Sequence, residues 1–159
     1  RHSIQGGDFI DSDLNEIVKD ALNELEIKIQ QNNAIIKIDP LPSIQVIPTL
    51  MRQLFYNLIS NALKHHDKKT GRIELTVADH GSHHAFSVKD DGPGIPVQFH
   101  DRIFKMFQTL RPRDQVEGSG MGLAIVRKQI ELSGGSYVLE SSVGEGTTFH
   151  FTLPTPERA

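Results

Sequence analysis

Three polar side chains stand at helical spacing within a strongly apolar segment, residues 48–66. They are Asn57, Asn61 and Lys64, at i, i+4 and i+7, which places them on one face of a helix. Asn is a poor helix former because its side-chain amide competes with the helix for hydrogen bonds to backbone groups. Two Asn residues within one predicted helix therefore need an explanation. One interpretation is a solvated helix face. The other is a binding stripe, in which an amide oxygen is a neutral ligand for Mg²⁺ and Lys64 places a positive charge beside phosphate.

A second candidate, Asp90, ends a segment with the alternating pattern of a strand. Period 2 puts its carboxylate on the same sheet face as Phe86 and Val88, where it needs a hydrogen-bond donor to offset desolvation. The exocyclic amine of adenine would be such a donor, whereas guanine would present a carbonyl oxygen. Gly92 and Gly94 would let the backbone pass close to a planar base. The alternative is an ordinary Asp-Gly turn.

A third candidate is a glycine triplet, Gly118, Gly120 and Gly122, that runs directly into a helical segment. Unpaired backbone N–H groups and the positive dipole end at a helix N-terminus favour phosphate. The motif lacks the Lys-Ser/Thr pair of a Walker A loop, and it follows a loop where a Rossmann fingerprint would follow a strand. A flexible linker is the alternative, and the helix that begins inside the motif argues against it.

The composition excludes several other kinds of site. The 159 residues include no Cys, which excludes thiolate zinc centres, iron–sulfur clusters and a Cys nucleophile. The formal charge is −3 and no basic run is present, so nucleic-acid binding has no electrostatic support. No apolar stretch approaches the roughly 20 residues that span a bilayer. We therefore expect a soluble, cytoplasmic domain without membrane contact of its own, although its parent protein can still be membrane-anchored.

The segments that position these residues are predicted as helices gathered between hairpins. Three segments have apolar residues at helical spacing: 13–31, 48–66 and 122–132. Two pairs of segments alternate as in hairpins, and two more are short and extended: 73–77 with 86–90, 136–141 with 147–153, and 34–38 and 43–47. Because there is no regular βαβ alternation, we predict an α+β fold. It is a two-layer α/β sandwich, with a mixed, mostly antiparallel sheet and three main helices on one face.

The three candidates occur in one chain in the order metal stripe, base reader and phosphate loop. With them, the sequence resembles the catalytic ATP-binding domain of sensor histidine kinases. This family belongs to the GHKL superfamily of the Bergerat fold, with gyrase B, Hsp90 and MutL. The resemblance covers nearly the whole chain and rests on five boxes in order. They are the N box at 57–64, the G1 box at 90–95, the F box at 103–107, the G2 box at 118–123 and a final glycine box at 144–149.

The resemblance implies a role for individual residues. It makes Asn61 the Mg²⁺ ligand and Asp90 the adenine reader, and it makes Asn57 and Lys64 catalytic, with Lys64 beside phosphate. The other residues expected at the nucleotide site are His65, Gly92, Gly94, Ile95, Phe104, Phe107, Arg111, Arg113, Gly118, Ser119, Gly120, Met121, Gly122, Leu123 and Thr147. The assignment of Arg111 and Arg113 to the site is based only on their charge and on their position in a polar lid segment. His65, where the family usually has an aromatic residue, is either a neighbour of the base or a surface residue.

The resemblance also implies a reaction. ATP hydrolases of the superfamily carry a Glu, as general base for water, at the place of Asn57, and an amide cannot accept that proton. This favours a kinase that holds ATP until a His on a separate, dimeric helical domain accepts the γ-phosphoryl. None of the eight His residues of the chain is predicted to be that acceptor. We expect residues 1–7 to be the remnant of a linker from the acceptor domain and residues 8–159 to form the catalytic domain.

Two other functions remain open. One is a serine kinase of the anti-sigma type, which shares the boxes, and the other is a nucleotide-binding or docking module that never transfers phosphate. A metal site at the hairpin tip, His80, His83 and His84, is a weaker possibility because no carboxylate arrangement completes it. The expected cofactors are ATP and Mg²⁺. The expected partners are the protein's own dimerisation domain and a downstream response-regulator receiver domain, with a homodimeric parent and a monomeric fragment.

Overall fold

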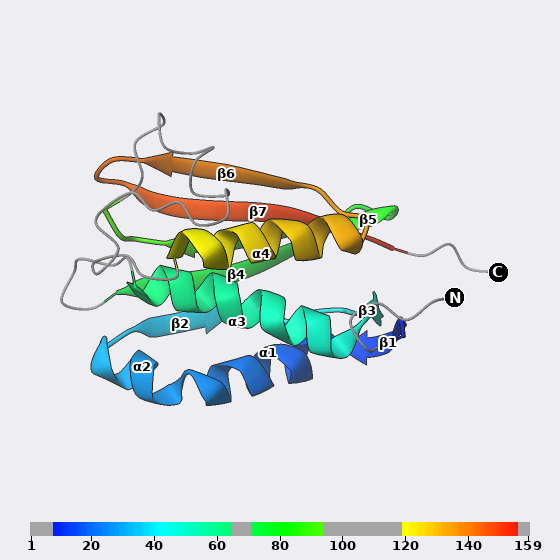
Figure 1. The fold of residues 1–159 in the computed structure, drawn as a ribbon, viewed down its shortest axis with the longest axis horizontal. Coiled ribbons are helices and arrows are strands. Elements are labelled where there is room, and N and C mark those ends of the chain that lie inside the picture. The colour runs from blue at the N-terminus through cyan, green and yellow to red at the C-terminus, as the bar shows by residue number, and fades with distance from the viewer. Residues whose placement is uncertain (1–7, 65–70, 94–118, 156–159) are drawn as a thin grey trace.

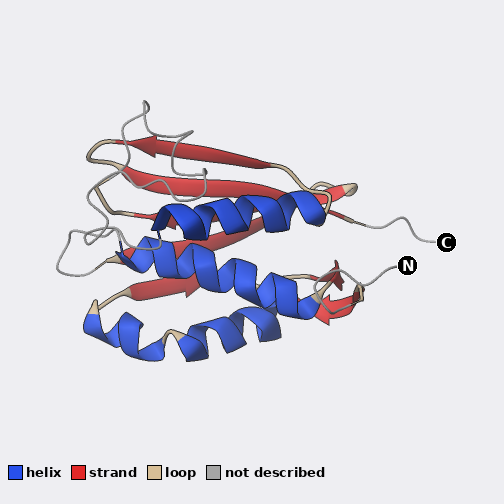
Figure 2. Cartoon of the chain, in the orientation of Figure 1, coloured by secondary structure: helices blue, strands red, loops and turns tan. Residues whose placement is uncertain are grey.

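Helices cover one face of a five-stranded sheet (Figure 1). The computed structural model describes residues 8–64, 71–93 and 119–155. Its helices are α1 (Leu14–Glu24), α2 (Glu26–Gln31), α3 (Pro48–Lys64) and α4 (Ser119–Leu132). Its strands are β1 (Ile10–Asp13), β2 (Ile35–Ile38), β3 (Ser43–Val46), β4 (Arg72–Asp79), β5 (His83–Asp90), β6 (Tyr137–Ser142) and β7 (Gly146–Pro154). The predicted two-layer α+β sandwich is confirmed, and Figure 2 shows its two layers by secondary structure.

The main sheet has the strand order β2-β4-β5-β7-β6. β2 pairs with β4 in parallel, and the other neighbours pair antiparallel. The one parallel pair arises because the chain between β2 and β4 passes through α3, which returns it to the same end of the sheet. The mixed, mostly antiparallel sheet and both predicted hairpins are therefore confirmed.

A separate two-stranded sheet joins β1 to β3, with Ile10 opposite Val46. β3 corresponds to the extended segment expected at 43–47, whereas β1 was not predicted. The side chains of β1 are mostly exposed and bury no face, so its sequence carries no alternating apolar pattern.

The first predicted helix, residues 13–31, is divided at Leu25 into α1 and α2. The backbone of Leu25 has φ −99° and ψ 5°, and its N–H donates to the carbonyl oxygen of Leu22 at 3.0 Å. This tight turn keeps the Leu25 side chain fully buried, whereas Ile27 is 68% exposed. The apolar spacing is continuous across the turn, so the pattern in the sequence did not indicate the break.

The aromatic centre of the core joins α3 to the two central strands. The Phe55 ring packs edge-on against Phe86 and Phe151, with ring centroids 6.3 and 6.0 Å apart, and Phe86 and Phe151 stack on each other at 5.0 Å. All three side chains are fully buried. Because large rings have few ways to interdigitate, this cluster holds α3 over β5 and β7.

The three candidate segments meet at one end of the fold (left in Figure 1). The C-terminal end of α3, the end of β5, the start of α4 and the turn between β6 and β7 all lie there. The start of α3 and the end of α4 lie at the opposite end. Among the described residues, no helix has both the length and the apolar character needed to cross a membrane.

Candidate functional site

The amide of Asn61 is oriented by its own helix. The side chain is 8% exposed, and Nδ2 donates to the carbonyl oxygen of Asn57 at 3.0 Å. With its nitrogen turned to the backbone, the amide presents Oδ1 as the end that can accept a cation or a donor. Asn57 is half-buried and Lys64 is exposed on the same helix. The three residues of the predicted stripe therefore lie on one helix, and the binding role of Asn61 stays a prediction.

Asp90 is the last residue of β5 and is half-buried. Its Oδ1 accepts a hydrogen bond from the backbone N–H of Gly92 at 2.9 Å. This is the local turn expected of an Asp-Gly pair, and it holds the carboxylate at the end of the strand. A carboxylate has further acceptor capacity beyond one such bond, so the turn is compatible with reading a base.

The neighbouring carboxylate, Asp91, faces a different part of the chain. Its Oδ1 accepts from the backbone N–H of Arg72 at 3.0 Å, at the start of β4. The two adjacent carboxylates thus have different partners, because successive residues of an extended chain point to opposite faces.

The turn between β6 and β7 packs directly onto the segment that follows β5. The N–H of Gly144 donates to the carbonyl oxygen of Pro93 at 2.7 Å. Gly146 has φ +86°, and a Cβ built on it would lie 2.2 Å from the carbonyl oxygen of Asp90. Sequence analysis placed both glycines in a box without assigning either a site role. In the structure, both glycines contact the segment that begins at Asp90.

Thr147 lies opposite Asp90 in β5 and opposite Ser141 in β6. Its Oγ1 is 2.7 Å from the hydroxyl oxygen of Ser141, which also donates to the carbonyl oxygen of Gly146 at 3.0 Å. Thr147 is therefore placed beside the predicted base reader, with its hydroxyl in a cross-strand hydrogen bond.

The helix that follows the glycine motif begins earlier than predicted. α4 starts at Ser119, three residues before Gly122, so Gly120, Met121 and Leu123 lie within its first turns. The backbone N–H groups of a first turn have no partners within the helix. They lie at the same end of the fold as the C-terminal end of α3 and the end of β5 (Figure 1).

Several predicted site residues lie outside the described part of the chain and stay predictions. They are His65, Gly94, Ile95, Phe104, Phe107, Arg111, Arg113 and Gly118.

The hairpin-tip metal site is not formed. Among the described residues, no group of three His, Asp or Glu side chains stands close enough to hold a metal ion. The rings of His80 and His83 stack with centroids 5.0 Å apart. His84, on the opposite strand face, is buried and hydrogen-bonds through Nδ1 to Thr155 Oγ1 at 3.0 Å. The alternation of the strand separates the side chains that the sequence places together.

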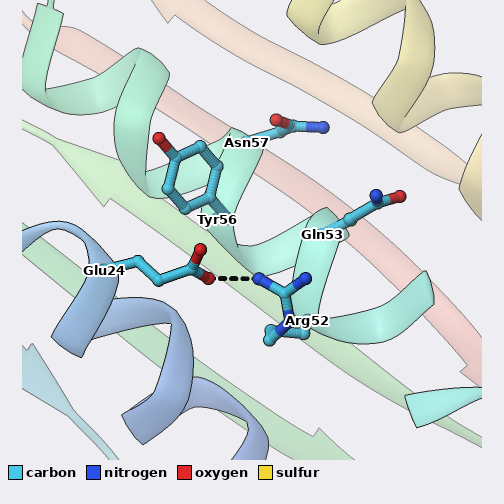
Figure 3. Close-up of a pocket in the computed structure, with 5 residues that line it drawn as sticks. All are labelled: Glu24, Arg52, Gln53, Tyr56 and Asn57. Atoms are coloured by element: carbon cyan, nitrogen blue, oxygen red, sulfur yellow. Dashed lines mark hydrogen bonds and ion pairs between the residues drawn. The ribbon is translucent and has the colours of Figure 1, made fainter. Parts of the chain in front are cut away.

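An open pocket of about 320 Å³ lies between α1 and α3, beside Asn57 (Figure 3). Arg52 in its wall forms an ion pair with Glu24 of α1. The side chains that line the pocket are Glu24, Arg52, Gln53, Tyr56 and Asn57. Sequence analysis missed this pocket, because its two walls come together only when the helices pack.

The model of the family described as histidine kinase-, DNA gyrase B-, and HSP90-like ATPase matches residues 46–157. The chain belongs to this family. The match runs from the end of β3 past the end of β7 and includes every site residue predicted from the five boxes. The family predicted from the five boxes is therefore confirmed.

The relatives of this chain include much longer proteins. Cyanobacterial phytochrome A of Nostoc sp. is 44% identical over 138 residues, which cover 87% of this chain and 18% of that protein. The adaptive-response sensory kinase SasA of Synechococcus sp. is 35% identical over 139 residues, covering 87% and 36%. The chain thus spans only about a fifth of the first of these relatives and a little over a third of the second.

Solved structures of histidine kinases are also similar to this chain. The nucleotide-free catalytic domain of the histidine kinase ThkA superimposes with a TM-score of 0.78 at 29% identity, covering 92% of this chain and 95% of that one. Full-length ShkA in complex with AMPPNP superimposes with a TM-score of 0.78 at 28% identity, covering 95% and 32%. The chain is therefore similar to the catalytic domains of histidine kinases in fold and sequence.

Proposed function

We propose that this domain binds ATP with Mg²⁺ and transfers the γ-phosphoryl to a His on a dimerisation domain outside this chain. The observation that carries the proposal is the pair of neutral amides on α3. Asn61 is turned by its bond to the Asn57 carbonyl so that an oxygen is presented, at the end of the fold that holds Asp90 and the start of α4. Similarity to sensory kinases, and to a ShkA structure that contains AMPPNP, supports the same proposal.

The described residues fit a magnesium nucleotide. Asn61 Oδ1 is a hard, neutral oxygen ligand of the kind that Mg²⁺ accepts while it keeps several waters. The Asp90 carboxylate would accept a hydrogen bond from the exocyclic amine of adenine. The first-turn N–H groups of α4 and the exposed ammonium of Lys64 are donors for phosphate oxygens. Mg²⁺ held at Asn61 would supply positive charge against the phosphates.

The proposed reaction is an in-line phosphoryl transfer. The lone pair of a neutral imidazole nitrogen forms a bond to the γ-phosphorus, and the bond from that phosphorus to the bridging oxygen breaks with its electrons leaving on ADP. The proton on the other ring nitrogen goes to solvent. The protein contributes positioning and charge neutralisation rather than covalent chemistry. Because the Asn57 amide cannot take a proton from water, hydrolysis lacks a base at this position.

In the same proposal, the parent protein is a homodimer that works in the cytoplasm. A response-regulator receiver domain then takes the phosphoryl group from the His. The similarity of the chain to only part of each longer protein supports a separate acceptor domain.

The test mixes this chain with γ-labelled ATP, Mg²⁺ and the separately purified acceptor domain of its parent protein. We expect label on the acceptor that is stable to alkali and labile to acid, as a phosphoramidate is. An acceptor domain with its His replaced by Gln is the matched control and should stay unlabelled. ATP binding without any such label would contradict the kinase proposal and favour a binding module, while acid-stable label on a Ser would favour the serine kinase.

A further inference from the structure

A polar pair lies at the edge of the apolar contact between α3 and α4, with Gln129 buried and Gln53 exposed. The side chain of Gln129, on α4, is 4% exposed, and its Nε2 donates to Oε1 of Gln53, on α3, at 3.2 Å. Its neighbours on α4, Val126 and Ile130, are fully buried. The pair is thus a directional contact within a surface that is otherwise held by non-directional packing.

The stability of the fold does not account for this pair. Within the described part of the chain, Oε1 of Gln129 is the buried side-chain polar atom that has no hydrogen-bond partner. An unpaired buried amide oxygen destabilises a protein, and a Leu of similar size would remove that penalty. Buried polar contacts of this kind are best known for setting the register of packed helices.

Gln53 connects this contact to the candidate site. It stands one helical turn before Asn57, which stands one turn before Asn61, so the three lie on one face of α3. Gln53 and Asn57 also line the same pocket (Figure 3). Gln53 therefore begins a polar stripe that sequence analysis recognised only from Asn57 onward.

Gln129 connects the contact to the other half of the site. It lies ten residues after Ser119, on the same helix whose start carries the glycine motif. A shift of α4 by one residue along its axis would move the first-turn N–H groups by about 1.5 Å relative to Asn61. A displacement of that size is enough to lose hydrogen bonds to a bound phosphate.

We propose that Gln53 and Gln129 are a positioning pair that sets the register of α4 against α3. The register determines how the phosphate chain fits between the start of α4 and Asn61. This inference rests on the proposed binding of ATP, and neither Gln touches the nucleotide in it. The pair acts on the phosphate end of the site and leaves the adenine end at Asp90 unchanged.

The test compares Gln129→Leu and Gln53→Leu with Gln53→Glu. A Glu at position 53 keeps an oxygen that accepts from Gln129 Nε2, and the position is exposed, so its charge stays solvated. Binding of ATP with Mg²⁺ is measured by calorimetry, binding of adenosine by chemical-shift titration, and stability by thermal unfolding without nucleotide.

We expect both Leu variants to bind ATP about three- to tenfold more weakly, a typical size for coupled neighbours. Adenosine affinity should not change, Gln53→Glu should bind ATP like the unaltered chain, and Gln129→Leu should unfold at the same temperature or higher. A purely structural role would weaken ATP and adenosine binding together.

Three results would overturn the inference. They are unchanged ATP affinity in both Leu variants, a parallel loss of ATP and adenosine binding, and an equal loss in Gln53→Glu and Gln53→Leu. Failure of the proposed ATP binding is recognised separately, because the unaltered chain would then bind neither ATP nor adenosine, and the inference would fall with it.

Discussion

Gly146 lies against the main-chain carbonyl of Asp90, so closely that a Cβ on Gly146 would come within 2.2 Å of the carbonyl oxygen. The same glycine has a φ of +86°, a backbone conformation that residues with a side chain rarely adopt. Two independent constraints therefore act on one residue. The start of β7 is held against the end of β5 where the candidate base reader stands.

Gly146→Ala should destabilise the fold and weaken ATP binding. The strained φ alone costs about 1–3 kcal/mol. The clash adds to this cost, because the Ala methyl group can be accommodated only if β7 moves away from Asp90. Denaturant unfolding measures the first effect, and calorimetric titration with ATP measures the second.

Gly144→Ala is the matched control for that variant. Gly144 has a φ of +85°, but a Cβ there would meet nothing within 4 Å. It should therefore show the cost of the backbone strain without the clash, and it keeps the N–H that donates to Pro93. Equal losses of stability and ATP affinity in the two variants would show that the contact with Asp90 has no functional weight.

Asp90→Asn should cripple ATP binding while leaving the fold intact. An Asn still accepts from the Gly92 N–H, so the turn at the end of β5 is kept. It loses the charge-assisted acceptance from adenine, which is worth roughly 1.5–3 kcal/mol. Asp91→Asn is the control, because Asp91 accepts from Arg72 instead. Unchanged ATP affinity in Asp90→Asn would remove this residue from the base site.

Asn61→Ala should act on the metal rather than on the nucleotide base. ATP affinity is measured with Mg²⁺ and again with EDTA, in the variant and in the unaltered chain. We expect the increase in ATP affinity caused by Mg²⁺ to be at least about tenfold smaller in the variant. Even the loss of a residue that only hydrogen-bonds to a metal ligand lowers metal affinity by about tenfold or more. The affinity in EDTA should stay nearly the same. An undiminished Mg²⁺ effect would refute the assignment of Asn61 as ligand.

Asn57→Glu should raise ATP hydrolysis. A carboxylate at this half-buried position could take a proton from water, which the amide cannot. A well-placed base contributes roughly 10²–10⁴-fold, so a rise of about tenfold is expected from one placed without optimisation. Phosphate release in the absence of an acceptor domain is the measurement. Asn57→Gln is the control and should show no rise, and a rise of equal size in Gln would disprove the role of the missing base.

The parts of the site that rest on short-range patterns could be predicted well. The i, i+4 spacing of Asn57 and Asn61 places them on one helix face whatever the helix packs against. Alternation along β5 likewise places Asp90 beside Phe86 and Val88, and the hairpin partners follow from the turns between them. The break at Leu25 could not be predicted, because the apolar spacing continues through it.

By itself, the sequence determined the order of the boxes, the family, the α+β class and the faces of α3 and β5, since each of these depends on residues close together along the chain. Only the tertiary structure decided which distant groups meet. The contact of Gly146 with Asp90, the bond between Gln53 and Gln129 and the pocket beside Asn57 join residues from 28 to 76 positions apart. Such contacts depend on the packing of whole elements, and no local pattern encodes the side chain that a neighbouring element will bring.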